Sequence, residues 1–204
     1  MITFLQQDTT SIKICGLRCE EHIDIAVGAG VNAIGFMFVK SSPRFIERHD
    51  AEQLLLQLPD DVLGVAVLQN YETIADFSDW NGWIQLCGDE DEEYVVNAPR
   101  PVIRAFKWNK EEVLRWDTCP NVEALLVDGS TGGLGTTFDV TELAKMVPSL
   151  SKPVIIAGGL TPENVRGVIA QANPAAVDVS SGVESSKGVK DPQKICDFMN
   201  AARE

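Results

Sequence analysis

Short apolar segments alternate along the chain with stretches that have the periodicity of amphipathic helices. Eight segments rich in valine, isoleucine and alanine are predicted strands: Ile12–Cys15, Ala33–Phe38, Val62–Leu68, Trp83–Cys87, Val102–Ala105, Ala124–Asp128, Val154–Ala157 and Ala176–Ser180. Helical patterns lie between them, including "EEHIDIAVGAG", "DAEQLLLQL", "NKEEVLRW", "FDVTELAKMV" and "TPENVRGVIAQA". The last of these predicts Thr161 as N-cap and Pro162 as the first helical residue. The segment "DEEYVVN" is expected to be the shortest helix.

Eight strands that alternate with helices predict a parallel sheet closed into a single (β/α)8 TIM barrel. An open, doubly wound sheet would usually have fewer strands and a glycine-rich first turn, whereas the first turn here, "CGLRCEE", has one glycine. The 204 residues contain no low-complexity linker, so we expect one domain over residues 1–204. A barrel of this length is compact for its class.

Composition and charge argue against several classes of protein. The longest apolar runs, such as Val65–Leu68, are too short to cross a membrane, and the N-terminus lacks the features of a secretory signal, which predicts a cytoplasmic protein. A net charge of -13 disfavours a nucleic-acid surface, so an anionic ligand must be held by local positive groups. The five scattered cysteines predict neither a disulfide framework nor a zinc site. The acidic run "GDEDEE" is expected to be a solvated loop and helix start.

Polar residues gather where the predicted strands end, which is where barrels carry their function. Strand alternation puts Lys13 and Cys15 on the same, inward side of the first strand. A buried lysine beside a thiol favours the thiolate, so Cys15 is a candidate base or nucleophile. The alternative is that Cys15 only packs as a small apolar side chain. His22 and His49 fall in predicted helices, so a histidine-based mechanism is not indicated.

The segment "EALLVDGSTGGLGTTFD" places Asp128 at the end of a strand, in the position of a general acid. Burial near the barrel mouth would raise the pKa of Asp128 and keep a proton available for a leaving oxygen. Alternatively, Asp128 only caps its loop. The loop does not fit the nucleotide-binding pattern G-x-x-x-x-G-K-[ST]. Its glycines, Gly129, Gly132, Gly133 and Gly135, suggest a mobile lid or a solvent loop without a role.

The motifs "IIAGGLTPENV" and "VDVSSGVE" end the last two strands with small residues. These residues are Gly158, Gly159, Ser180, Ser181 and Gly182. Backbone N–H groups here, with a following helix N-terminus, would form a phosphate site where barrels commonly have one, although either motif alone is also typical of a tight turn. Arg44 in "KSSPRF" has a planar guanidinium that suits a carboxylate, or it is an ordinary surface arginine.

Taken together, the sequence motifs resemble those of the phosphoribosylanthranilate isomerases, tryptophan-pathway enzymes of the ribulose-phosphate-binding barrels. The matching segments are "KICG", "GVNAIGFMFVKSSPRFI", "LLVDGSTGGLGTTFD", "IIAGGLTPENV" and "VDVSSGVE", in that order over essentially the whole chain. The resemblance implies a cofactor-free Amadori rearrangement, without a metal. The substrate would be N-(5'-phosphoribosyl)anthranilate and the product 1-(2-carboxyphenylamino)-1-deoxyribulose 5-phosphate.

The resemblance also implies roles for individual residues. Cys15 would be the general base that takes the C2' proton, and Asp128 the general acid that protonates the furanose ring oxygen. Arg44 would hold the anthranilate carboxylate, and Asp178 would point inward near the ribose. The phosphate would be held by the loops that contain Gly158, Gly159, Ser180, Ser181 and Gly182.

Two departures from the family pattern qualify these roles. The usual "QLHG" at the end of strand four reads "QLCG" here, and Val140 stands where "FDW" is common. Cys87 cannot copy the donor and acceptor pair of an imidazole, which puts substrate positioning by that strand in question. Two alternatives remain open: the related histidine-pathway isomerase, whose two similar halves this chain lacks, and a catalytically silent barrel that binds a phosphosugar or a partner protein. The sequence does not indicate the oligomeric state.

Overall fold

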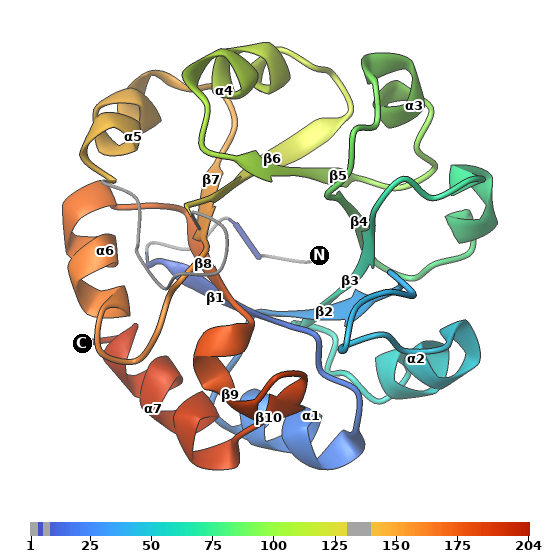
Figure 1. Ribbon diagram of the computed structural model, residues 1–204, viewed down its shortest axis with the longest axis vertical. Coiled ribbons are helices and arrows are strands. Elements are labelled where there is room, and N and C mark those ends of the chain that lie inside the picture. Colours follow the sequence, from blue (N-terminus) through green and yellow to red (C-terminus); the bar gives the residue numbers. More distant parts are fainter. Residues whose placement is uncertain (1–3, 6–8, 130–139) are drawn as a thin grey trace.

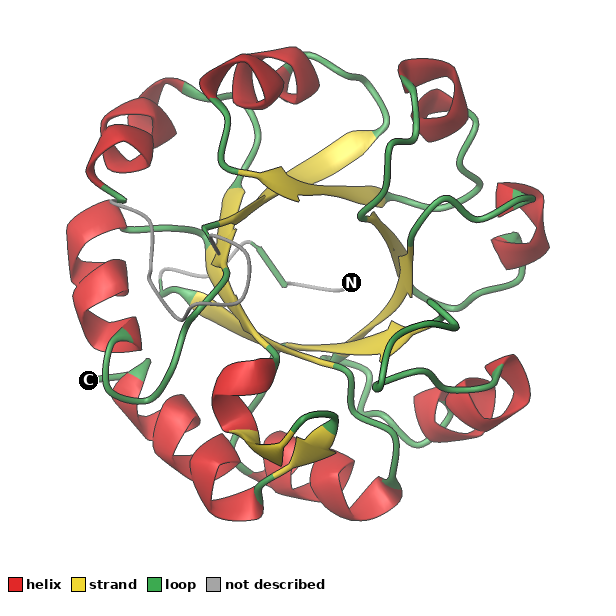
Figure 2. Ribbon diagram, viewed as in Figure 1, coloured by secondary structure: helices red, strands yellow, loops and turns green. Residues whose placement is uncertain are grey.

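The chain forms a closed barrel of eight parallel strands surrounded by helices. The computed structural model describes residues 4–5, 9–129 and 140–204. The strands follow one another around the barrel in sequence order, and β8 pairs with β1 to close it. Seen end-on, the helices form a ring outside the strands (Figures 1 and 2). The predicted (β/α)8 barrel is therefore confirmed.

All eight predicted strands are present, with ends that differ from the prediction by at most two residues. They are β1 Ser11–Cys15, β2 Ala33–Met37, β3 Leu63–Leu68, β4 Trp83–Leu86, β5 Val102–Lys107, β6 Val122–Asp128, β7 Val154–Ala157 and β8 Ala176–Val179. A short antiparallel hairpin, β9 Glu184–Ser186 and β10 Val189–Lys190, follows β8 and was not predicted. Its two strands are too short and polar to show a strand pattern.

Each helix named in the sequence predictions is present, although some ends differ, and the last helix, α7, was not among those predictions. They are α1 Glu20–Gly28, α2 Arg48–Leu55, α3 Glu92–Val96, α4 Lys110–Asp117, α5 Thr141–Met146, α6 Val165–Ala172 and α7 Pro192–Ala201. The expected short segment, α3, is the shortest α-helix in the described part of the chain. Three 3-10 turns, η1 Ile74–Phe77, η2 Val147–Ser149 and η3 Ser181–Val183, complete the connections described.

The start of α6 differs from the prediction because a turn precedes it. The N–H of Thr161 donates to Asn164 Oδ1 at 2.8 Å, and the Asn164 amide donates to the Gly159 carbonyl at 2.9 Å. The helix then begins at Val165, so Thr161 is not its N-cap and Pro162 is not its first residue. The Asn164 side chain ties this turn to the glycine loop that follows β7.

The first strand alternates as predicted between the helix layer and the barrel interior. Ile12 and Ile14 pack into the cluster between strands and helices, whereas Cys15 belongs to the interior cluster. A Cβ atom added to Gly35 of β2 would lie 3.1 Å from Lys13 Nζ and 3.0 Å from Cys15 Sγ. Both polar side chains therefore point inward, into space that a glycine on the neighbouring strand leaves open.

Phe4, ahead of β1, fills the amino-terminal end of the barrel. Phe4 is buried in the interior cluster, and its ring packs edge-on against Trp83, the first residue of β4, with centroids 6.2 Å apart. Residues 4–5, the coloured part of the chain near its start, lie within the ring of strands in Figure 1. Phe4 therefore plugs the amino-terminal end of the barrel and leaves the carboxyl-terminal end open. None of the helices in the described ranges has the length and apolar character needed to cross a bilayer.

Candidate active site

A cavity of about 360 Å³ lies at the carboxyl-terminal ends of the strands. All but one of the predicted site residues line it: Arg44, Asp128, Gly158, Gly159, Asp178, Ser180, Ser181 and Gly182. Residues far apart in the chain meet here because parallel strands end at the same rim of a barrel. The lid glycines Gly132, Gly133 and Gly135 lie outside the described residues.

Cys15 is the predicted site residue that does not line the cavity. It ends β1, is 4% exposed and packs in the barrel interior. The hydroxyl of Ser180, a residue of the cavity wall, donates to the Cys15 carbonyl at 3.1 Å. The backbone of Cys15 is thus adjacent to the cavity, but Cys15 is not part of its lining.

Lys13 lowers the pKa of Cys15, as the sequence predicts, but burial outweighs this effect. Burial raises the pKa of Cys15 above its ordinary value, and attraction to Lys13, Lys190 and Arg44 does not offset this. One reason is that Lys13 Nζ lies 2.8 Å from Asp178 Oδ1, whose negative charge opposes that of a thiolate. Burial alone would lower the pKa of Lys13, but Asp178 and Cys15 together raise it, so Lys13 stays charged.

Asp128 is the last residue of β6 and lines the cavity. The residue is in register with Lys107 of β5 and Ala157 of β7. The sheet continues one step further, since the Gly129 N–H donates to the Ala157 carbonyl at 2.9 Å. Asp128 is therefore held by a regular strand at the cavity, on the opposite half of the barrel from β1.

Arg44 is a fixed, mostly buried side chain and not an ordinary surface arginine. Its Nε and Nη2 donate to the two carboxylate oxygens of Glu184 at 2.6 and 2.9 Å. Lys190 Nζ donates to Glu184 at 3.1 Å and to the Ser180 carbonyl at 2.8 Å. Burial alone would raise the pKa of Glu184, but the hydrogen bonds from Arg44 and Gly188 and the charge of Lys190 bring it down to about 2.

Sequence reasoning missed Glu184 and Lys190. Both lie on the hairpin β9–β10, and both are buried despite their charge. The available signal was the short segment "VESSKGVKD", in which a glycine with φ of +82° at residue 188 turns the chain back. Through Lys190, this hairpin joins the Arg44 side of the cavity to the loop after β8.

The loops after β7 and β8 require glycine at several positions. Gly158 and Gly159 have φ values of +89° and +68°, in the left-handed region where a Cβ is unfavourable. A Cβ on Gly182 would lie 1.8 Å from the Leu160 carbonyl oxygen, so the two loops touch at that residue. This close packing brings the two predicted phosphate segments together in one wall of the cavity.

The end of β4 adds two cavity residues, Gln85 and Cys87, to those that the sequence analysis selected. Gln85 Nε2 donates to Cys87 Sγ at 3.2 Å. Burial raises the pKa of Cys87 to about 12, in spite of this hydrogen bond, so the thiol is neutral. Cys87 occupies the cavity position where the sequence departs from "QLHG".

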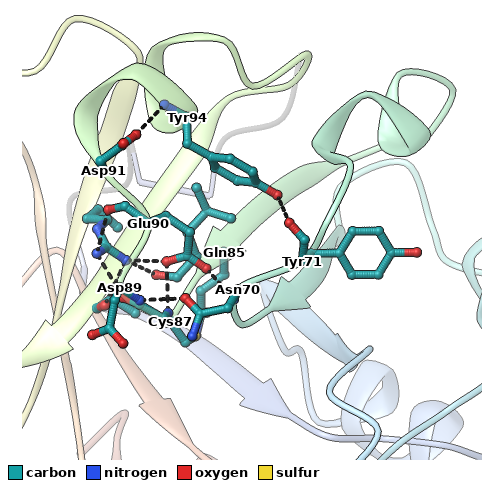
Figure 3. Close-up of polar contacts among 12 residues, drawn as sticks. Asn70, Tyr71, Gln85, Cys87, Asp89, Glu90, Asp91 and Tyr94 are labelled. Atoms are coloured by element: carbon teal, nitrogen blue, oxygen red, sulfur yellow. Dashed lines mark hydrogen bonds and ion pairs between the residues drawn. The ribbon is translucent and has the colours of Figure 1, made fainter.

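The loop that follows Cys87 is anchored by a buried ion pair. Arg104 of β5 lies 2.9 Å from Glu90, and the guanidinium also donates to the Leu86 carbonyl at 3.0 Å. Glu90 accepts hydrogen bonds from the backbone N–H groups of Asn70 and Gly88, both at 2.8 Å (Figure 3). Glu90 is 7% exposed, so the prediction that the whole acidic run is solvated is wrong at this residue.

These features define the class of the protein: a (β/α)8-barrel enzyme with its polar cavity at the carboxyl-terminal mouth. The family model for N-(5'phosphoribosyl)anthranilate (PRA) isomerase matches residues 12–201, and the chain belongs to that family. It is 38% identical to the N-(5'-phosphoribosyl)anthranilate isomerase of Dechloromonas aromatica over 200 residues, which cover 95% of this chain and 96% of that protein.

Solved structures give the same result. The phosphoribosyl anthranilate isomerase of Thermotoga maritima superposes with a TM-score of 0.87 at 33% identity, covering 96% of this chain and 99% of that one. A phosphoribosyl anthranilate isomerase in complex with reduced 1-(o-carboxyphenylamino)-1-deoxyribulose 5-phosphate superposes with a TM-score of 0.84 at 32% identity, covering 96% and 99%. The family resemblance inferred from the sequence is confirmed, and the histidine-pathway alternative is not supported.

Proposed function

We propose that this protein converts N-(5'-phosphoribosyl)anthranilate to 1-(2-carboxyphenylamino)-1-deoxyribulose 5-phosphate, with Asp128 as general acid and Cys15 as general base. The observation that carries the proposal is the shared cavity: Asp128 lines it together with Arg44 and the glycine loops, and Cys15 lies directly beside it. A relative of the same family binds the reduced product, as stated above.

The cavity offers a place for each end of this substrate. The loops that contain Gly158, Gly159, Ser180, Ser181 and Gly182 would hold the phosphate through backbone N–H groups. Arg44 would bind the anthranilate carboxylate through Nη1, which Glu184 does not engage. With both ends held, the reacting carbons are fixed between the acid and the base.

The overall reaction is an isomerisation, so substrate and product contain the same atoms. Asp128 gives a proton to the ring oxygen as the C1'–O bond breaks, and the nitrogen lone pair forms a C1'=N bond. The Cys15 thiolate removes the C2' proton, and the released electron pair forms C1'=C2' while the nitrogen regains its pair. The enol then becomes the ketone by proton transfer from oxygen to C1'. Asp178, oriented by Lys13, would accept a hydrogen bond from a ribose hydroxyl.

The proposal is tested by assay of the purified protein on freshly prepared phosphoribosylanthranilate, with loss of substrate fluorescence as the readout. We expect turnover by the parent and a loss of at least ~100-fold in Cys15→Ser and in Asp128→Asn, as for removal of a general base or acid. Cys196→Ser on α7 is the matched control and should keep parent activity. Parent protein that binds the reduced product without turning the substrate over would instead support the catalytically silent alternative.

A further inference from the structure

Gln85 is a buried polar side chain that the proposed mechanism leaves without a role. It lies on β4, in register with Val67 of β3 and Ile103 of β5, and both of these neighbours belong to the barrel-interior cluster. Gln85 is 4% exposed and lines the active-site cavity. Its amide therefore points inward, and the only solvent it can meet is that of the cavity.

The two ends of this amide differ in their contacts. Nε2 donates to Cys87 Sγ at 3.2 Å, whereas Oε1 has no hydrogen-bond partner within the described part of the chain. Buried carbonyl oxygens are nearly always paired, and an unpaired one lowers stability. An unpaired oxygen in the wall of a substrate cavity is explained if the substrate supplies the missing donor.

The surroundings of Gln85 keep the amide in this orientation. The Cys87 N–H donates to the Leu68 carbonyl at 2.9 Å, which extends the sheet past the end of β4. Beyond Cys87, the ion pair between Glu90 and Arg104 anchors the loop. Figure 3 labels Glu90 in the same close-up as Gln85 and Cys87. Cys87 is thus a fixed acceptor for Nε2, and Oε1 is left for a ligand.

We propose that Gln85 is a substrate-positioning residue whose Oε1 accepts a hydrogen bond from a neutral N–H or O–H group in the middle of the substrate. The inference rests on the proposed function. An amide oxygen repels the anionic ends, for which the cavity has Arg44 and the glycine loops. The donors that remain are the secondary amine between ring and sugar and the ribose hydroxyls. Cys87 supports this contact by holding the other end of the amide.

The test compares Gln85→Met, which keeps the size of the side chain and removes the acceptor, with the exposed control Gln57→Met beyond α2. We expect Gln85→Met to raise KM, and the Kd for the reduced product measured by calorimetry, roughly fivefold to tenfold, as for one neutral hydrogen bond. The control should match the parent. Ribulose 5-phosphate, which lacks the amine, distinguishes the two candidate donors. If Gln85→Met also binds ribulose 5-phosphate more weakly than the parent does, the donor is a hydroxyl. If the two proteins bind it with the same Kd, the donor is the amine.

A second variant distinguishes loss of the acceptor from loss of the fold, and its affinity for the ligand should depend on pH. Gln85→Glu keeps an acceptor oxygen, and while its carboxyl is protonated it should bind the reduced product nearly as well as the parent. Affinity should fall as pH rises and the carboxylate repels the anionic ligand. A folded Gln85→Met with parent KM and Kd overturns the inference, as does a Gln85→Glu variant whose binding is weak at every pH. A parent that binds the reduced product through Gln85 but has no turnover would refute only the proposed function.

Discussion

At the scale of the residue, the structure shows burial competing with charge at the proposed base. Cys15 has Lys13, Lys190 and Arg44 within electrostatic reach, yet its pKa is raised because the thiol is buried and Asp178 opposes the thiolate. The sequence could place Lys13 and Cys15 on one face of β1 because strand alternation is a local property. The sequence could not show whether burial or the nearby charges determine the pKa of Cys15, because the partner of Lys13 is Asp178, at the other end of the chain.

This raised pKa predicts how the rate depends on pH. In Asp128→Asn, which has no titrating general acid, the thiolate fraction of Cys15 alone sets the pH dependence, so the residual kcat/KM should rise about tenfold per pH unit from pH 7 and should not level off below pH 9. The measurement is kcat/KM across pH 6 to 10, with circular dichroism to confirm that the fold persists. Cys15→Ser should show no such rise. A plateau reached below pH 8 would mean that substrate binding or another group, and not the buried thiol, sets the profile.

At the scale of the element, the hairpin β9–β10 orients a cavity side chain that belongs to a distant loop. Glu184 holds Arg44 by two hydrogen bonds, and Lys190 joins Glu184 to Ser180. The eight barrel strands could be predicted because each is a buried apolar run between turn signals. The hairpin and the turn before α6 could not, because tertiary hydrogen bonds from side chains such as Asn164 determine them.

Replacing the carboxylate in this hairpin should weaken substrate binding more than catalysis. We expect Glu184→Gln to raise KM roughly fivefold to tenfold, because Arg44 loses its charged partner and is less well fixed for the substrate carboxylate. The change in kcat should be smaller, since neither Asp128 nor Cys15 is touched. The exposed residue Glu123 on β6 provides the control Glu123→Gln, which should behave as the parent. An unchanged KM in Glu184→Gln would show that Arg44 does not depend on the hairpin for its position.

At the scale of the whole molecule, the two ends of the barrel have different tasks. The carboxyl-terminal end holds the polar cavity, and the amino-terminal end is filled by Phe4 against Trp83. The position of the cavity could be predicted from the sequence, because the polar strand ends of a barrel share one rim. The packing of Phe4 in the opposite end could not be predicted, because the sequence before β1 has no strand or helix pattern that would show where it packs.

The plug should contribute to stability and not to catalysis. Phe4→Ala leaves a cavity in a closed interior, so we expect the free energy of unfolding to fall by roughly 3 kcal/mol while KM and kcat stay at parent values. The free energy of unfolding is measured by urea denaturation followed by tryptophan fluorescence. KM and kcat are measured with the fluorescence assay of the substrate. Leu56→Ala, at a residue that is 77% exposed, should change the stability little. A fall of less than about 1 kcal/mol in Phe4→Ala would show that the barrel end does not need its plug.

The glycine on β2 beneath the proposed base carries a consequence for how this enzyme tolerates change. Residue 35 has no functional group, yet the single methyl of an alanine would press on both the amine of Lys13 and the sulfur of Cys15. A survey that replaces every position in turn should therefore find that substitutions at this position lower activity, and that side chains larger than alanine lower it more. Ranking positions by the reactivity of their side chains would miss it, because what matters there is empty volume.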